Sequence, residues 1–393
     1  MNAIASVRNP TKVPNTASRA TLSHCSSQVV KRRIDMQGGN AATAGLQATA
    51  SQAPAQGLPV RRAFLDVAGI DVPPLGLGLA ALGRPGYINL GHARDLSAGI
   101  DREAMRQQCW RVLDAAYAAG VRYFDAARSY GAAEDFLSSW LTARSLTPGS
   151  VLVGSKWGYT YTADWRVDTG GAPHEVKDHS LPRLVAQSGE SRALLGPWLR
   201  LYQVHSATLD SGVLQSREVL AELEQLKGEQ GWKIGLSLSG AGQAATLRRA
   251  LQLTTRSGAL LFDSVQATWN LKEQSAGPAL LEAAEAGLHV IVKEAMANGR
   301  LLSWQDPDAG SPLQLMAAKL GCSPDALALA VAMVQPFRPM VLSGAATVEH
   351  MTSNAMAPAV AASLVWDDVA QLMEQMRQPA EKYWEERAGL AWN

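Results

Sequence analysis

A regular alternation of short apolar runs with helical patterns is the feature that most constrains how this chain folds. The apolar runs are four to six residues long, and between them apolar residues recur at the spacing of an amphipathic helix, as from Met105 to Ala116. The expected strands are Leu75–Leu79, Val121–Phe124, Val151–Lys156, Leu201–His205, Lys233–Ser237, Leu261–Gln266, Leu288–Lys293 and Pro339–Ser343. Eight strands that alternate with helices predict an α/β fold closed into a parallel (β/α)8 barrel, the TIM-barrel fold.

The composition divides the chain into residues 1–60, 61–365 and 366–393. The first part contains eleven Ala, eleven Ser or Thr and six Lys or Arg, but a single acidic residue, Asp35. An acid-poor, basic and hydroxyl-rich N-terminus is typical of organelle transit peptides. We therefore expect residues 1–60 to be disordered and to direct the chain to a chloroplast, with a mitochondrion or the cytoplasm as alternatives. Residues 61–365 are expected to form the barrel, and residues 366–393 a helical tail packed on it.

Charge and cysteine content narrow the classes of partner. The 36 basic and 35 acidic residues nearly balance, which argues against nucleic acid or a membrane surface as a partner. No apolar stretch approaches the roughly 20 residues of a membrane-spanning helix. The three cysteines, Cys25, Cys109 and Cys322, are far apart and lack metal-ligand spacing. The sequence thus predicts no metal site and fits a reducing compartment.

Four reactive side chains fall at or just after the ends of three expected strands. Asp125 and Tyr130 follow the second strand, Lys156 ends the third and His205 ends the fourth. Because the carboxyl ends of barrel strands meet at one face, we expect these side chains to lie together. A phenol has a pKa near 10, and a nearby ammonium lowers it, so Tyr130 beside Lys156 is a candidate proton donor. Asp125 would hold Lys156 in place, and His205 would orient a substrate oxygen.

These residues and several downstream motifs resemble the aldo-keto reductase family. The matching segments are Phe124-Asp125, Tyr130-Gly131 with Glu134, Ser155-Lys156, Gln203-Val204-His205, Ile234-Gly-Leu-Ser237, Val265-Gln266, Ala297-Asn-Gly299, Gly344-Ala345 and Ser353-Asn354. The resemblance implies a (β/α)8 barrel that uses NADPH, or less often NADH, to interconvert carbonyls and alcohols. It implies that Tyr130 donates the proton, that Lys156 and Asp125 tune it, and that His205 orients the substrate. The sugar-dehydrogenase branch, which includes plant L-galactose dehydrogenase, looks more similar to this chain than the classic aldose reductases do.

The resemblance also implies a set of cofactor contacts. They are Ser237, Gln266, Lys293, Gly299, Gly344, Ala345, His350 and Asn354. Three positions depart from the family's pattern: Leu238 replaces a common Asn, Lys293-Glu294 replaces an aromatic or small residue followed by Ser, and His350 replaces an Arg that binds the adenosine 2′-phosphate. We expect Lys293 and Glu294 to pair with each other. Because His is only partly charged at neutral pH, we expect NADP(H) to be preferred over NAD(H) less sharply than with Arg.

The third expected strand leads into a long loop, residues 157–180, that is rich in aromatic side chains. Trp157 and Tyr159 directly follow Lys156, so we predict that they contact the substrate. Packing that closes the barrel mouth is an equal alternative for this loop.

Together these patterns predict an enzyme, an NADP(H)-dependent oxidoreductase that interconverts an alcohol and a small carbonyl compound, which is an aldehyde, a ketone or a sugar. Two alternatives stay open. A Lys at a barrel strand end can form a Schiff base, as in class I aldolases, and Lys156 and Lys293 both qualify. The chain could also be a cofactor-binding redox sensor with little turnover, since the four intact reactive side chains argue against lost catalysis but not against slow turnover. The substrate, the physiological direction and the oligomeric state are not specified by the sequence.

Overall fold

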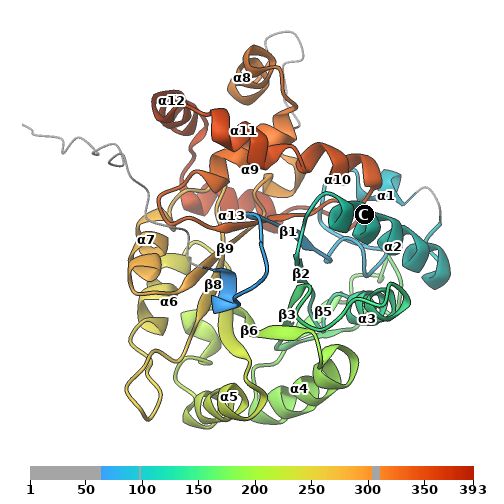
Figure 1. The fold of residues 1–393 in the computed structure, drawn as a ribbon, viewed down its shortest axis with the longest axis vertical. Coiled ribbons are helices and arrows are strands. Elements are labelled where there is room, and N and C mark those ends of the chain that lie inside the picture. Colours follow the sequence, from blue (N-terminus) through green and yellow to red (C-terminus); the bar gives the residue numbers. More distant parts are fainter. Residues whose placement is uncertain (1–62, 97–98, 303–309) are drawn as a thin grey trace, which may run out of the picture. The chain divides into compact units, whose positions relative to one another are not determined.

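The computed structural model describes residues 63–96, 99–302 and 310–393. The predicted transit peptide, residues 1–60, lies outside the described residues. Within the described ranges, eight parallel strands close into a barrel with helices between them (Figure 1). The predicted (β/α)8 fold is therefore confirmed.

The barrel strands follow one another around the barrel in chain order. They are β1 (Leu75–Gly78), β2 (Tyr123–Asp125), β3 (Leu152–Trp157), β6 (Leu199–Ala207), β7 (Lys233–Leu238), β8 (Ser264–Thr268), β9 (His289–Lys293) and β10 (Met340–Ser343). The barrel closes where β1 pairs in parallel with both β2 and β10. Each predicted strand is present, although β8 begins at Ser264 rather than at Leu261.

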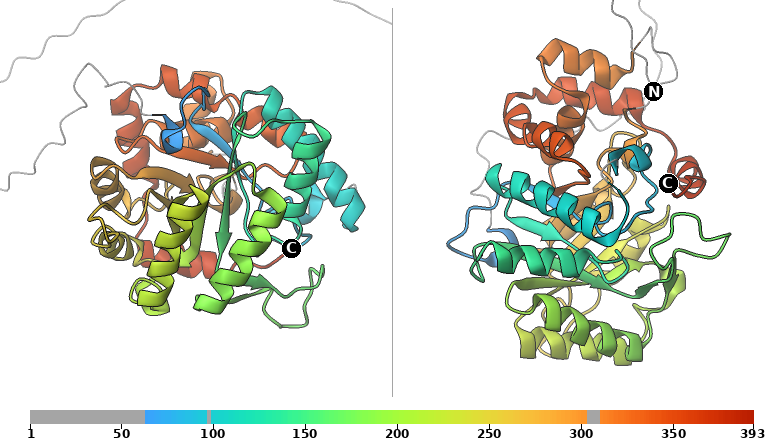
Figure 2. Two further views of the ribbon diagram at one scale, coloured as in Figure 1. Left: turned by 60° about the horizontal axis from the view of Figure 1, so that its bottom comes forward. Right: turned by 90° about the vertical axis from the view of Figure 1, so that its right-hand side faces the viewer.

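Helices fill the connections and cover the outside of the barrel (Figures 1 and 2). They are α1 (His92–Asp95), α2 (Arg102–Ala118), α3 (Ala133–Ala143), α4 (Leu181–Leu195), α5 (Arg217–Gln230), α6 (Gln243–Ala250), α7 (Gly277–Glu285), α8 (Pro312–Leu320), α9 (Pro324–Met333), α10 (Val348–Asn354) and α11 (Ala357–Ser363). The helical spacing correctly predicts the buried face of α2, where Met105, Cys109 and Val112 pack into the core. Three short 3-10 helices, η1 (Phe64–Asp66), η2 (Leu209–Ser211) and η3 (Ala297–Gly299), lie in the connecting segments.

The two ends of the barrel are closed differently. At the end where the strands begin, η1 places Phe64 and Leu65 in a buried cluster with Tyr123 and Ile291. At the other end, the long loop after β3 forms a small antiparallel hairpin of β4 (Tyr159–Tyr161) and β5 (Glu175–Lys177). The loops at this second end surround the candidate site.

The chain after the barrel forms α12 (Trp366–Met376) and α13 (Ala380–Ala388). Helix α13 is anchored by Tyr383, which is fully buried and lies under the Arg300 guanidinium at 4.2 Å from the ring centre. Beyond α13 the backbone of Asn393 exchanges two hydrogen bonds with Tyr87, of 3.0 and 3.1 Å. The C-terminal segment is thereby held against the long loop that follows β1.

The described residues contain neither a membrane-spanning helix nor a cluster of metal ligands. No single helix there is long and apolar enough to cross a membrane, and α8 and α9 pass by length and composition only as a pair bent by 94°. No group of three or more His, Cys, Asp or Glu side chains in the same residues is arranged to hold a metal ion.

Two loops at the catalytic end touch through their backbones at Gly83. The Gly83 carbonyl accepts a hydrogen bond of 2.7 Å from the Ala132 amide. A Cβ atom at position 83 would lie 2.2 Å from the Tyr130 carbonyl oxygen and 2.7 Å from the Ala133 amide nitrogen. Glycine at this position therefore allows the loop after β1 to support the loop that carries Tyr130.

We predict that Gly83→Ala lowers the free energy of unfolding by about 1–3 kcal/mol, the usual cost of overpacking a tightly packed site. The matched control is Gly228→Ala in α5, where an added Cβ meets no atom within 4 Å. That variant should keep or slightly raise stability because Ala favours the helix. Urea unfolding measures both variants, and equal stability of the two would contradict the close contact at Gly83.

Candidate active site

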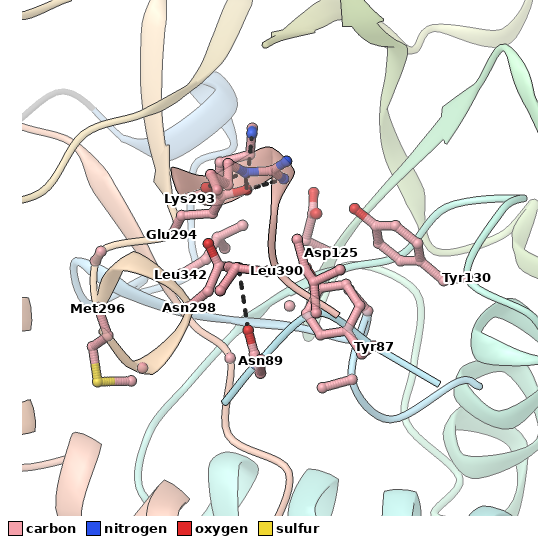
Figure 3. Close-up of a pocket in the computed structure, with 18 of the residues that line it drawn as sticks. Tyr87, Asn89, Asp125, Tyr130, Lys293, Glu294, Met296, Asn298, Leu342 and Leu390 are labelled. Atoms are coloured by element: carbon pink, nitrogen blue, oxygen red, sulfur yellow. Dashed lines mark hydrogen bonds and ion pairs between the residues drawn. The ribbon is translucent and has the colours of Figure 1, made fainter. Parts of the chain in front are cut away.

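The barrel brings the four predicted catalytic side chains to one place. Asp125 ends β2, Tyr130 lies on the following loop, and Lys156 and His205 lie in β3 and β6. Asp125, Tyr130 and His205 line a cavity of about 290 Å³ at the carboxyl ends of the strands (Figure 3). Lys156 has no exposed surface and lies behind Asp125 and Tyr130, with its amine in contact with both.

Asp125 and Lys156 form a buried ion pair. The Lys156 amine donates to Asp125 Oδ2 and, at 2.9 Å, to the Ala126 carbonyl. The other carboxylate oxygen accepts three hydrogen bonds, from Tyr123 Oη at 3.0 Å, Gln203 Nε2 at 3.2 Å and Gln266 Nε2 at 3.0 Å. Each charge thus has a partner, which is what allows two ions to stay charged in the barrel interior.

The Tyr130 hydroxyl lies 3.3 Å from Lys156 Nζ and 3.5 Å from His205 Nε2. Burial, followed by the negative charge of Asp125, raises the pKa of Tyr130 well above its usual value. The expectation that Lys156 lowers this pKa is therefore wrong for the described geometry. The physical reason is that burial disfavours the charged phenolate and that Asp125 adds a nearby negative charge, so Tyr130 remains a neutral phenol that can donate a proton.

His205 is held uncharged. Burial, followed by the positive charges of Lys156, Lys293 and Arg84, lowers the pKa of His205 well below its usual value. Its Nδ1 lies 3.3 Å from the Ser129 hydroxyl. When Ser129 donates to Nδ1, the Nε2 atom carries the proton and can donate a hydrogen bond into the cavity.

Arg84 is a site residue that the sequence did not single out. It is buried, and its Nη1 atom donates to the Ser129 carbonyl at 2.9 Å and to Glu175 Oε2 at 2.8 Å. Its guanidinium lies over the Tyr130 ring at 5.3 Å and over the Trp392 ring at 4.8 Å. Because these partners come from distant parts of the chain, no local sequence pattern pointed to Arg84.

Four of the predicted cofactor positions line the cavity. They are Gln266, Lys293, Gly299 and Gly344. At Gly344 an added Cβ would meet only one nearby atom, Asn89 Nδ2 at 4.0 Å, so its backbone faces open space. Asn298 also lines the cavity, and its buried amide oxygen has no hydrogen-bond partner among the described residues. An elongated polar ligand, with one end at Tyr130 and the other near Gly344, fits these features.

The other four predicted positions do not line the cavity. Ser237 Oγ accepts a hydrogen bond from the Ser206 amide, and Ala345 N and Asn354 Nδ2 both donate to Ser343 Oγ. His350 is half exposed, and its Nδ1 lies 4.0 Å from Asp95 Oδ2. Three of these side chains are thus buried supports around β7 and β10, and His350 lies at the surface of α10.

The structure corrects one predicted substrate contact. Trp157 has no exposed surface, belongs to the core and packs edge-on against His179 with ring centres 5.6 Å apart. The prediction that Trp157 contacts the substrate is therefore wrong. Trp157 is the last residue of β3, and its side chain packs in the hydrophobic core. Tyr159 is half-buried and lies edge-on to His205 with ring centres 5.0 Å apart.

The predicted pair of Lys293 and Glu294 is present but is not the main contact of either residue. Lys293 Nζ lies 3.6 Å from Glu294 Oε1 and donates to Thr268 Oγ1 at 2.9 Å. Arg387 of α13 donates three hydrogen bonds of 2.5 to 2.9 Å to the Glu294 carboxylate. Burial alone would raise the pKa of Glu294, but Lys293 and Arg387 outweigh it and hold the pKa at about 2.

Comparison with known proteins assigns this barrel to a family. The sequence profile of the aldo/keto reductase family matches residues 74–375. The chain belongs to the aldo-keto reductase family. The matched range contains the whole barrel and the four side chains gathered at its catalytic end.

Individual relatives are distant. A Saccharomyces cerevisiae protein named as an aryl-alcohol dehydrogenase is 26% identical over 215 residues, which cover 53% of this chain and 52% of that protein. The chain thus matches about half the length of this curated relative. An aldo-keto reductase from Klebsiella pneumoniae in complex with NADP and acetate is 22% identical, with a TM-score of 0.56 over 78% of this chain and 93% of its own. The holo form of a Bacillus halodurans aldo-keto reductase is 20% identical, with a TM-score of 0.55 over 81% of this chain and 98% of its own.

We predict strong energetic coupling between Asp125 and Lys156. Asp125→Asn leaves the Lys156 ammonium buried without a counter-charge, which costs about 3–5 kcal/mol of unfolding free energy. In the double variant Asp125→Asn/Lys156→Met neither charge remains, so its loss should be smaller than the sum of the two single losses by at least about 1 kcal/mol. Urea unfolding of the four proteins measures the coupling, and additive losses would contradict a buried ion pair.

Proposed function

We propose that this aldo-keto reductase interconverts a carbonyl compound and an alcohol with NADP(H), using Tyr130 as the proton donor. The observation that carries the proposal is the position of the Tyr130 hydroxyl. It lies at the wall of a cavity, within reach of both the Lys156 ammonium and His205 Nε2. A phenol in this setting can give a proton to an oxygen atom that gains negative charge.

The residues of this chain divide the work of reduction. NADPH supplies the hydride when it is bound. Tyr130 gives its proton to the substrate oxygen, and Lys156, at 3.3 Å, stabilises the phenolate that remains. Asp125 keeps Lys156 in place through their ion pair. Neutral His205 donates a hydrogen bond from Nε2 to the same substrate oxygen and so fixes its direction.

The proposed preference for NADP(H) over NAD(H) rests on the family and on a relative whose crystal structure contains the cofactor. The Klebsiella pneumoniae aldo-keto reductase has been crystallised with NADP. In this chain His350, the proposed partner of the adenosine 2′-phosphate, lies near the carboxylate of Asp95. That carboxylate weakens the attraction for a phosphate, so we propose a modest preference and keep NAD(H) as the second cofactor.

We propose a small aldehyde, ketone or sugar as the carbonyl substrate. The resemblance to the sugar-dehydrogenase branch favours a sugar, whereas the yeast relative is named for aryl alcohols. The aromatic side chains of Tyr87 and Trp392 line the cavity and suit either an aryl ring or the apolar face of a sugar. Tyr159 stays a proposed contact for the substrate because it lies against His205.

A Schiff-base enzyme remains the second candidate because of Lys293. Burial lowers the pKa of this cavity-lining amine to about 8, so part of it is uncharged near neutral pH. Lys156, by contrast, is tied up in its ion pair. Borohydride reduction in the presence of substrate separates the two functions, since a reductase leaves no covalent adduct on Lys293.

We predict that Tyr130→Phe lowers kcat by at least about a hundredfold, because positioned proton transfer is typically worth 10²–10⁴-fold. Cofactor affinity should stay unchanged, since only the hydroxyl is removed. Tyr117→Phe is the matched control, because Tyr117 lies on α2 and stacks with Arg122 instead of lining the cavity. Steady-state kinetics with a panel of carbonyl compounds and NADPH measure the effect, and a Tyr130→Phe rate within threefold of wild type would remove Tyr130 as the donor.

We also propose that residues 1–60 direct the protein to a plastid, with cleavage within residues 35–60 and with a mitochondrion as the second destination. The basis is the acid-poor, hydroxyl-rich composition of that segment. A fluorescent protein fused behind residues 1–60 should enter plastids. Retention of the fusion in the cytosol would contradict the proposal.

A further inference from the structure

The charged groups around the cavity do not balance. Asp125 is paired with Lys156, and Glu175 is paired with Arg84. These two pairs leave one carboxylate and two cations among the described cavity residues, namely Glu294 with Arg387 and Lys293. Counted with Lys156, which lies behind the cavity wall, these groups carry one positive charge in excess.

The contacts assign that excess charge to Lys293. Arg387 occupies both oxygens of Glu294 with three hydrogen bonds, whereas Lys293 Nζ lies farther from this carboxylate, at 3.6 Å. The closest hydrogen-bond acceptor of Lys293 is the uncharged hydroxyl of Thr268, at 2.9 Å. Arg387 belongs to α13, so the packing of this C-terminal helix places Arg387 on Glu294. Lys293 is thereby left without a full counter-charge.

The Lys293 ammonium lies in the same cavity in which hydride transfer must occur. Lys293 and Tyr130 line the same cavity, and Asp125 lies between them in Figure 3. A carbonyl group that accepts a proton from Tyr130 must also lie about 3–3.5 Å from the hydride donor. The reacting nicotinamide ring must therefore lie in this cavity of about 290 Å³, close to the Lys293 ammonium.

We propose that Lys293 makes the site bind NADPH more tightly than NADP⁺, a proposal that rests on the proposed function. The two forms share their phosphates and adenine, so those contacts cancel in the comparison. They differ in the nicotinamide ring, which is uncharged in NADPH and positively charged in NADP⁺. An unmatched ammonium in a confined cavity repels the charged ring. The site therefore stays loaded with reduced cofactor and releases the oxidised form, which favours carbonyl reduction.

The test compares the dissociation constants of NADPH and NADP⁺. Quenching of tryptophan fluorescence measures both constants, and Trp392 at the cavity wall is the reporter. In the wild-type protein Kd for NADP⁺ should exceed Kd for NADPH by at least about tenfold, or 1.4 kcal/mol. Lys293→Met should bring the ratio close to one, and Lys293→Arg should keep it because the charge remains. Lys319→Met is the control, since Lys319 is exposed on α8 and pairs with Asp368.

A second measurement needs no variant. The charged groups that face Lys293 are Glu294, which directly follows β9, Arg387 of α13, Lys156 of β3 and His205 of β6. Glu294 with a pKa of about 2 and His205 with a lowered pKa do not change charge near neutral pH, and the pKa of Arg387 is raised. Since burial lowers the pKa of Lys293 to about 8, the ratio of the two dissociation constants should fall as the pH rises through this value.

The outcomes separate the two claims. A ratio that is unchanged in Lys293→Met, or constant from about pH 6 to about pH 10, overturns the role of Lys293 and leaves the reductase function standing. Failure of the wild-type protein to bind either NADPH or NADP⁺ contradicts the proposed function itself.

Discussion

The buried ion pair between Asp125 and Lys156 is the interaction on which the site depends. Two opposite charges without water are stable only when both are also hydrogen-bonded. The barrel meets this demand with groups from several strands: Tyr123 of β2, Gln203 of β6 and Gln266 of β8 all donate to Asp125. The closure of the barrel and the charge state of its catalytic end therefore depend on each other.

The same pair explains the protonation of the neighbouring groups. Lys156 lies next to Tyr130, but burial and the negative charge of Asp125 raise the pKa of Tyr130, so the phenol keeps its proton. Burial and the neighbouring positive charges lower the pKa of His205, so His205 stays neutral. The arrangement stores a proton on Tyr130 until an oxygen atom in the cavity gains negative charge. Lys156 then stabilises the phenolate, which is when its proximity matters most.

The sequence predicted the features that repeat along the chain or sit next to strand ends. The strand and helix alternation located all eight barrel strands, and the strand ends located Asp125, Tyr130, Lys156 and His205. It could not find Arg84, whose contacts with Glu175 and Trp392 exist only after distant loops meet. It also missed the bond from Arg387 to Glu294, for the same reason. Trp157 was misplaced because a residue adjacent to Lys156 along a strand points to the opposite side.

The central claim is that Tyr130 is a neutral phenol beside a charge-paired lysine. Nuclear magnetic resonance of protein labelled with ¹³C at tyrosine Cζ tests it most directly, with the Tyr130 signal assigned by its loss in Tyr130→Phe. The account predicts that this signal keeps the shift of a neutral phenol from about pH 6 to about pH 10, because burial and Asp125 raise the pKa. Ionisation of Tyr130 between about pH 6 and about pH 9 would contradict it, since Lys156 would then dominate over Asp125.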